Sequence, residues 1–304
     1  MMKNYNFVGN LKRALIISAA IMLVGVACLA IFGVKMDISF KGGTRIQYSY
    51  TEAPDLAKFE KAAEEVLKGN VEIAKDDNGD TKLVTVTMTD NITGDDQEAL
   101  HERVKKDFPD SKLEVFNSNT LSASMGSKFL LRCLLALGLA AVLLVFYVGF
   151  RFRKIGGITA GVSAMIALVH DLLIVFFTFV IFGIELDNNF VAVMLTILGY
   201  SLNDTIVIFD RVRTLRRRSD AALEDVVNDS LHHVLRRTII TTVTTCLAIL
   251  SVLIVALVMG VDSIISFALP MLFGAISGSY SSLFLSGPIW VRWMNAIEKK
   301  GAKK

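Results

Sequence analysis

The sequence predicts an α-helical membrane protein with six transmembrane helices and one small α+β domain outside the membrane. Two observations predict this class. Apolar stretches recur along the chain, several of them longer than the 18 or so residues that cross a bilayer core of about 30 Å. A long polar region, residues 35–126, separates the first stretch from the second. With 53% apolar residues in 304, the chain is not an ordinary soluble enzyme built around one core.

Each of the six apolar stretches is a candidate transmembrane helix, which needs about 20 predominantly apolar residues. The last stretch is longer than a span requires, and a tilted helix accommodates such an excess. The stretches cover residues 14–34, 128–149, 157–182, 190–209, 238–260 and 264–290.

Basic residues predict the orientation, because short cytoplasmic loops are enriched in Lys and Arg. The loops 183–189 and 260–263 contain neither residue type. We therefore expect both termini in the cytoplasm and residues 35–126 on the outer side. The basic positions on the predicted cytoplasmic side are Lys3, Lys12, Arg13, Arg151, Arg153, Lys154, the run from Arg211 to Arg237, Lys299, Lys300, Lys303 and Lys304.

This orientation predicts four parts of the chain. Residues 1–34 are the cytoplasmic N-terminus and the first span, and residues 35–126 are an extracytoplasmic domain. Residues 127–293 hold spans two to six with a cytoplasmic loop at 210–237, and residues 294–304 form a basic cytoplasmic tail.

The outer region has the pattern strand, helix, strand, strand, helix, strand. Its strands alternate polar and apolar residues and its helices are amphipathic, the first beginning at Pro54. The run Asp77-Asn78-Gly79-Asp80 predicts a hairpin turn. This βαββαβ order suits a ferredoxin-like split sandwich, a fold that does not by itself indicate a function. The predicted elements are Thr44–Tyr50, Pro54–Lys68, Val71–Lys75, Lys82–Thr89, Gly94–Phe108 and Leu113–Phe116.

Between spans four and five, the stretch Ser219–Leu235 has apolar residues at helical spacing and a polar opposite face. We expect an interfacial helix there. His232 and His233 lie at its end. They lack further ligands at a suitable spacing, so no metal site is predicted.

Asp204 is the clearest candidate functional residue. A charged residue in the middle of a transmembrane helix costs about 2.5–3.5 kcal/mol on an insertion scale. Asp204 lies in span four, about two helical turns or roughly 10 Å before Arg211. Burial disfavours the charged form, so such a group can bind and release a proton. The alternative is that Asp204 is a structural carboxylate that pairs with a neighbouring helix. Asn203 is expected on the same face of span four as Asp204.

Three further charged positions lie in or next to the spans. Arg237 begins span five, where it either faces Asp204 or anchors the helix at the lipid headgroups. Asp171 follows His170 near the middle of span three; it either helps a proton path or hydrogen-bonds to another helix. Arg132 lies within a turn or two of the outer end of span two, where a long cationic side chain can reach the headgroups.

Small residues recur at four-residue spacing in span six, at Gly274, Gly278 and Ser282. This spacing predicts close helix packing. The partner helix belongs either to this chain or to a second subunit.

Three motifs resemble those of the SecF family of bacterial protein-export subunits. The resemblance covers nearly the whole chain, with one span, an outer domain and then five spans. The motif in span four is the most specific. The motifs are Gly199-Tyr200-Ser201-Leu202-Asn203-Asp204-Thr205 continuing to Asp210-Arg211-Val212-Arg213, Leu235-Arg236-Arg237-Thr238-Ile239-Ile240-Thr241, and Phe40-Lys41-Gly42-Gly43-Thr44.

The resemblance implies a subunit in the bacterial inner membrane that pairs with SecD beside the SecYEG channel. Such a subunit uses the proton motive force to promote late steps of preprotein export, and it is related to the resistance–nodulation–division transporters. The family's aspartate in span four corresponds to Asp204 and its arginine in span five to Arg237. The Phe-x-Gly-Gly motif corresponds to Phe40, Gly42 and Gly43. A further carboxylate of the family's proton site belongs to SecD.

The chain departs from the family pattern at two positions. Ser39 precedes Phe40 where the family often has Asp, and Asp37 lies two positions earlier. Thr242 stands where the family often has Ser. Neither position belongs to the predicted proton site.

Other functions are excluded or remain as alternatives. The chain has no phosphate-binding loop, nucleophile elbow or metal motif, so we predict no enzyme activity, cofactor, metal or nucleic-acid partner. One alternative is a small-molecule efflux subunit of the resistance–nodulation–division class. Another is a scaffold that stabilises SecD without transport. The residues leave open whether the coupling ion is H⁺ or Na⁺.

Overall fold

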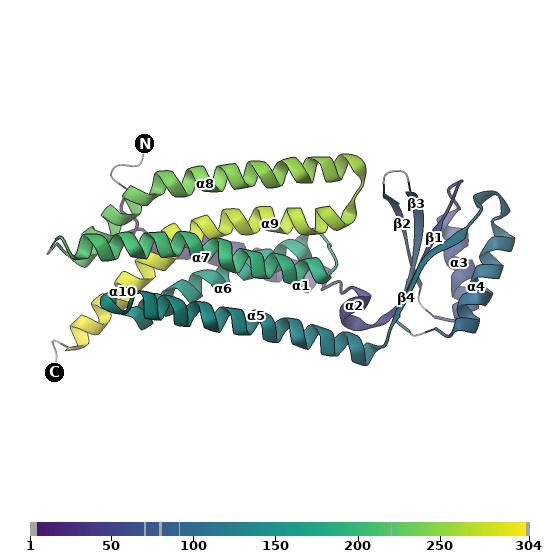
Figure 1. Cartoon of the computed structure of the whole chain (residues 1–304), viewed down its shortest axis with the longest axis horizontal. Coiled ribbons are helices and arrows are strands. Elements are labelled where there is room, and N and C mark those ends of the chain that lie inside the picture. The colour runs from purple at the N-terminus through teal and green to yellow at the C-terminus, as the bar shows by residue number, and fades with distance from the viewer. Residues whose placement is uncertain (1–4, 70, 79–80, 91, 220, 302–304) are drawn as a thin grey trace.

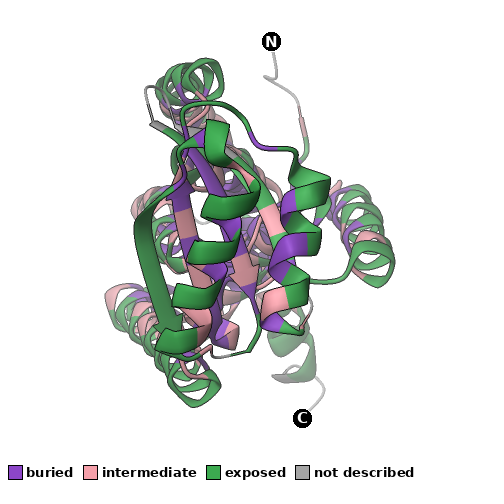
Figure 2. Cartoon of the chain, turned by 90° about the vertical axis from the view of Figure 1, so that its right-hand side faces the viewer, coloured by how far each residue is buried: buried purple, intermediate pink, exposed green. Residues whose placement is uncertain are grey.

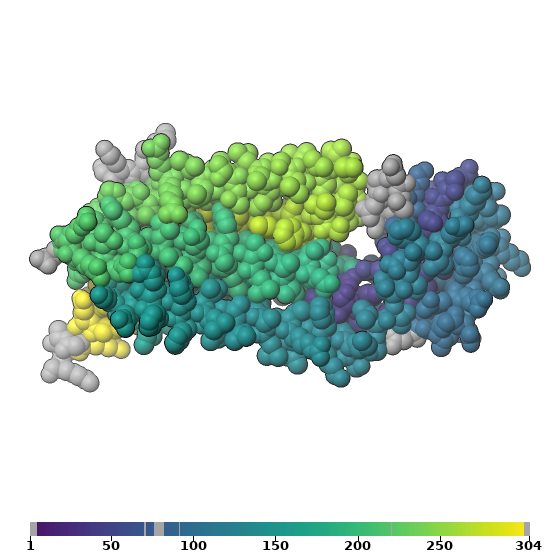
Figure 3. All heavy atoms as spheres, viewed as in Figure 1, coloured from purple at the N-terminus to yellow at the C-terminus, as the bar shows by residue number. Residues whose placement is uncertain are grey.

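The computed structural model describes residues 5–69, 71–78, 81–90, 92–219 and 221–301. The molecule is elongated, with a bundle of long helices at one end and a small sheet domain at the other (Figure 1). Figure 3 shows that the two parts join where α2 (Ile38–Lys41) lies against α5 (Ala123–Arg151).

Six helices within the described residues are long and apolar enough to cross a membrane, which confirms the predicted number of spans. The last span is interrupted by one π-helical turn, η3. The helices are α1 (Leu11–Phe32), α5, α6 (Gly157–Ile181), α7 (Asn188–Arg216), α8 (Leu223–Met259), and α9 (Asp262–Ser281), which continues through η3 (Ser282–Ser286) into α10 (Gly287–Gly301).

The predicted interfacial helix is not a separate element. It is the first part of α8, which runs without a break into the fifth span. No Pro or Gly lies between Leu223 and Met259 to end the helix. Its apolar face packs inside the bundle, where Val227 and Leu231 are fully buried.

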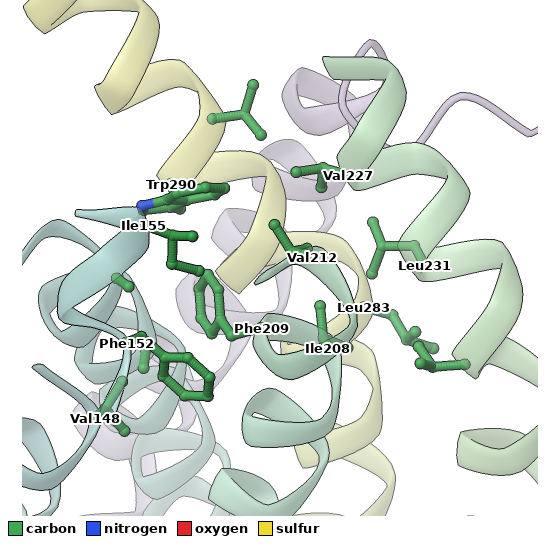
Figure 4. Packing of buried hydrophobic residues seen from close by; sticks show 14 of the residues in the cluster. Val148, Phe152, Ile155, Ile208, Phe209, Val212, Val227, Leu231, Leu283 and Trp290 are labelled. Atoms are coloured by element: carbon green, nitrogen blue, oxygen red, sulfur yellow. The ribbon is translucent and has the colours of Figure 1, made fainter. Parts of the chain in front are cut away.

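A large apolar cluster holds the helices together at the end of the bundle away from the sheet domain (Figure 4). Phe209 of α7 and Trp290 of α10 meet edge to face, with ring centroids 5.6 Å apart. Phe152, just past α5, contacts Phe209 at 5.7 Å. The other labelled members are Val148, Ile155, Ile208, Val212, Val227, Leu231 and Leu283.

The sheet domain, residues 43–121, is a four-stranded antiparallel sheet in the order β2-β3-β1-β4. Two helices cover one face of the sheet (Figure 2). Tyr48, Phe59 and Leu100 are fully buried between the sheet and these helices. The elements are β1 (Gly43–Ser49), α3 (Leu56–Leu67), β2 (Val71–Asn78), β3 (Thr81–Met88), α4 (Gly94–Asp107), the 3₁₀ turn η1 (Pro109–Ser111) and β4 (Glu114–Leu121).

Capping side chains set the starts of the two domain helices. Asp55 accepts hydrogen bonds from the backbone of Ala57 and Lys58 and caps α3, so Pro54 precedes the helix and does not begin it as predicted. Thr93 forms a capping box at the start of α4. Two residues of the predicted hairpin turn, at positions 79 and 80, lie outside the described residues.

Candidate functional site

Asp204 lies on α7 with its side chain buried inside the bundle. Its Oδ2 atom is buried and has no hydrogen-bond partner among the described residues. Arg237 of α8 acts on this carboxyl group electrostatically. Both residues are described, yet no nitrogen–oxygen contact within 4.0 Å joins them. Asp204 and Arg237 therefore interact through their charges but do not form a direct ion pair.

Asn203 and Arg237 are exposed on the surface of the helix bundle. Asn203 is adjacent to Asp204 in the chain but points out of the core that buries Asp204. The predicted site residues thus separate into a buried carboxyl group and two polar side chains at the surface beside it.

Asp171 of α6 forms a second polar centre inside the bundle, and its side chain is fully buried. Its carboxylate accepts hydrogen bonds from Ser201 Oγ at 2.6 Å, Ser277 Oγ at 2.6 Å and Ser281 Oγ at 2.7 Å. His170 Nδ1 lies 3.2 Å from the same carboxylate. Of the two sequence-based alternatives, hydrogen bonding to other helices is directly observed, since Asp171 joins α6 to α7 and α9.

The two polar centres are connected through α7. Ser201, which binds Asp171, lies one helical turn before Asp204 and Thr205. Thr205 Oγ1 and Ser282 Oγ are 2.9 Å apart, and Ser282 also donates to the Ser201 carbonyl at 3.2 Å. Ser282 begins the π-helical turn η3. Such turns frequently mark functional sites, and the sequence pattern did not indicate this one.

The small residues of α9 allow this close approach. A Cβ atom at Gly274 would lie 2.7 Å from Ile197 Cγ1, and one at Gly278 would lie 3.0 Å from Ser201 Cβ. The predicted small-residue stripe therefore packs against α7 of the same chain. Nearby, Thr242 of α8 hydrogen-bonds to Ser279 of α9.

The Phe-x-Gly-Gly motif forms the connection between the bundle and the sheet domain. Gly42 and Gly43 have φ angles of 81° and 130°, a region that favours glycine. A Cβ at Gly42 would lie 2.4 Å from Ala123 Cα, and one at Gly43 would meet the backbone of β3. Phe40 is buried and stacks on Phe129 of α5 with centroids 5.7 Å apart. Residues 33–42, which include α2 and join α1 to β1, are called the connector. The motif thus packs the connector onto α5.

An ionic cluster beside this motif was not found from the sequence. Arg45 of β1 lies 2.5 Å from Asp37 and 3.1 Å from Glu185, which is in the loop between α6 and α7. Asp37 also caps α2 by accepting from the backbone of Ser39 at 2.8 Å. The adjacent residues Met36 and Leu186 form a short parallel bridge. The only sequence signal was the position of Asp37, two residues before Ser39, which stands where the family often has Asp.

The two carboxyl groups of this cluster differ in their electrostatics. Burial raises the pKa of Asp37, but the hydrogen bonds from Ser39 and the charge of Arg45 outweigh it and leave the pKa below its ordinary value. Burial dominates at Glu185 and raises its pKa, which the charge of Arg45 offsets only in part.

The chemistry of these sites is that of charge and hydrogen bonding. Within the described ranges, no group of three or more His, Cys, Asp or Glu side chains could hold a metal ion. The fold and the site together define a polytopic membrane protein with buried carboxyl groups between its helices and a small sheet domain outside the bundle.

The chain belongs to the SecD/SecF family, as its motifs predict. The family profile described as "Protein export membrane protein SecD/SecF, C-terminal" matches residues 101–296. The protein translocase subunit SecF of Alicyclobacillus acidocaldarius is 31% identical over 301 residues, covering 95% of this chain and 92% of the relative. The SecF subunit of Rhodothermus marinus is 31% identical, covering 94% of this chain and 92% of the relative.

Longer relatives contain a region similar to this chain. The protein translocase subunit SecDF of Bacillus subtilis is 30% identical, covering 98% of this chain and 39% of the relative. The crystal structure of SecDF from Thermus thermophilus, a translocon-associated membrane protein, superposes with a TM-score of 0.79 at 26% identity. It covers 96% of this chain, which spans 39% of the length of that protein.

Proposed function

We propose that this protein is a SecF-type subunit that works with SecD to promote preprotein export through SecYEG, using the proton motive force. The observation that carries the proposal is the buried Asp204 carboxyl group, which has an unpartnered oxygen and an arginine nearby. Ionisable groups inside a membrane are costly and are characteristic of proton pathways. The names of the relatives supply the link to protein export.

SecD is the partner that the surface beside Asp204 suits. Asn203 and Arg237 are exposed next to a buried carboxyl group, so polar side chains of a second subunit could complete the site. In the SecDF relatives, the region similar to this chain is 39% of a longer protein. We propose that SecD, as a separate subunit, takes the place of the remaining part of those chains.

The coupling mechanism that we propose combines the charge of Asp204 with the hydrogen bonds of Asp171. Protonation removes the negative charge that attracts Arg237 and frees α7 to shift against α8. Asp171 and its serine partners carry this shift to α6 and α9. A charge that crosses the membrane gains about 2.3 kcal/mol per 100 mV, which is enough to bias two states separated by a few kcal/mol.

The proposed orientation places both termini in the cytoplasm of a bacterial inner membrane and residues 35–126 outside. The basic run Arg151, Arg153 and Lys154 supports it, since it lies at the end of α5 away from the sheet domain. The strand order β2-β3-β1-β4 supports a ferredoxin-like arrangement for the domain. The domain is attached to the bundle at α2 and α5, so a shift of the helices reaches it.

Export into inverted membrane vesicles tests the proton role. In Asp204→Asn, the part of export that depends on the proton gradient should disappear, while export without a gradient should equal that of the wild type. Asp262→Asn is a matched control, because Asp262 is exposed and is the first residue of α9. Normal gradient-driven export in Asp204→Asn would show that this carboxyl group is not the coupling site. Repeating the assay with a Na⁺ gradient identifies the ion.

A further inference from the structure

A pocket of about 420 Å³ opens beside the start of α5, at the end of the bundle that carries the sheet domain. Its volume lies within the range of ligand-binding pockets. Most of its lining is apolar and comes from Leu121, Met125 and Phe129. Ser39 of α2 and Asn188 of α7 add polar groups to the lining.

Two cations stand at this pocket, Lys128 and Arg132 of α5. They are four residues apart and therefore lie on one helical face. Both are exposed. Neither forms an ion pair with an acidic side chain in the part of the chain that the structure describes.

The position of these cations along α5 matches a lipid headgroup layer. At a rise of 1.5 Å per residue, Arg132 is about 28 Å from Arg151 along the helix. This separation is close to the thickness of a bilayer hydrocarbon core, about 30 Å. With Arg151 at one membrane surface, Arg132 therefore stands at the other, and Lys128 lies one turn further out.

One side of α5 packs on α6, α7 and α2, and its other side is not covered by this chain. Its most apolar stretch of 18 residues contains no buried residue, and α5 lies along one edge of the bundle (Figure 1). A phosphate group is a suitable counter-charge at this depth, since Arg can bind it through two parallel hydrogen bonds. The apolar wall beside the cations is suited to acyl chains.

We propose that this pocket binds an anionic phospholipid. Lys128 and Arg132 hold the headgroup phosphate, while Met125 and Phe129 contact the acyl chains. Phe129 also stacks on Phe40 of the connector, so the lipid lies against the element that joins the helix bundle to the sheet domain. The inference does not depend on the proposed export function.

Lipid selectivity in vesicles tests the proposal. The full chain, extracted with its native partners, is reconstituted into phosphatidylcholine vesicles that contain spin-labelled phosphatidylglycerol or spin-labelled phosphatidylcholine. The fraction of each probe immobilised by the protein gives their relative affinity. The wild type should prefer phosphatidylglycerol. Lys128→Ala and Arg132→Ala should each lower the preference about fivefold, the expected effect of one cation near an anionic lipid.

Two further variants make the test specific. Arg132→Lys retains the charge but loses the two parallel hydrogen bonds, so it should lower the preference less than Arg132→Ala does. Lys35→Ala removes an exposed cation from the same end of the bundle but outside the pocket and should leave the preference unchanged. Equal affinity for the two probes in the wild type would overturn the proposal. So would an equal loss in Lys35→Ala, or displacement of the lipid by inorganic phosphate alone, which would indicate a site for free anions.

Discussion

Arg45 and Asp37 join the sheet domain to the connector that leads out of the membrane, with Arg45 Nη2 2.5 Å from Asp37 Oδ2. Arg45 is on β1 and Asp37 caps α2. The same guanidinium group reaches Glu185 between α6 and α7. One side chain of the domain is therefore bound to two separate segments at the end of the bundle.

Removing Arg45 should loosen the domain. Asp37 is buried, and Arg45→Ala leaves its carboxylate without its cation. We expect Arg45→Ala to lower the free energy of unfolding by about 1.5–3 kcal/mol, measured by thermal unfolding in detergent. Arg103→Ala is the control, because Arg103 forms exposed ion pairs within the same domain and should cost less than about 1 kcal/mol. Equal effects would contradict a special role for Arg45.

Acid should weaken the stabilising contribution of Asp37. Its pKa is lowered in the folded protein, so the unfolded chain binds the proton more readily. The contribution is fully present above the unfolded-state pKa of about 3.9 and is lost as the pH falls through the lower folded-state pKa. Unfolding measured from pH 6 to pH 2 should show this loss in the wild type and a smaller loss in Asp37→Asn.

Glu185 should take up a proton at a higher pH than Asp37. Its pKa is raised, so protonation favours the folded state, and its contribution to stability falls as the pH rises from the ordinary glutamate pKa through the raised one. Between the ordinary and the raised pKa, protonated Glu185 binds Arg45 more weakly, while Asp37 stays ionised. Infrared difference spectra should show a carboxylate band titrating above the ordinary glutamate range. The band should be absent in Glu185→Gln, and its persistence there would assign it to another residue.

Substitution by Asn should affect stability differently at Asp171 and Asp204, the two carboxyl groups inside the bundle. The Asp171 carboxylate accepts hydrogen bonds from three serine hydroxyl groups. In the Asp171→Asn variant an NH₂ group replaces one carboxylate oxygen, so it would face a hydroxyl donor that has lost its acceptor. Asp171→Asn should therefore lower the free energy of unfolding by about 1–3 kcal/mol. Asp204→Asn should change it little, because Asp204 Oδ2 has no partner among the described residues. Thermal unfolding of both variants checks the difference, and equal destabilisation would contradict it.

Gly42 should be far less replaceable than Gly33. Both have positive φ angles, 81° and 68°, with ψ angles of 173° and −164°, so Ala costs about 1–3 kcal/mol of backbone strain at either. A Cβ at Gly33 meets no atom within 4 Å, whereas one at Gly42 would lie 2.4 Å from the backbone of α5. Gly42→Ala should displace the connector and increase proteolysis of the sheet domain, while Gly33→Ala should leave proteolysis near the wild-type rate.

Local sequence patterns determined the spans and the order of elements in the sheet domain. Apolar runs must be buried in lipid, and alternation or helical spacing follows from the geometry of each element. The pattern was misleading at Ser219–Leu235, where an amphipathic face suggested a membrane surface. That face instead packs inside the bundle as the first part of α8, because a neighbouring helix and a membrane surface bury apolar residues equally well.

The sequence by itself singled out Asp204, Asp171 and the adjacent glycines Gly42 and Gly43. Charges inside apolar runs and adjacent glycines are unusual, so they can be recognised before any contact is known. Only the tertiary structure decided their partners. Asp171 meets Ser277 and Ser281 from α9, and Arg45 meets Glu185 across 140 positions of the chain. Such contacts depend on how the helices and the domain pack, and nothing in the local spacing of residues specifies that packing.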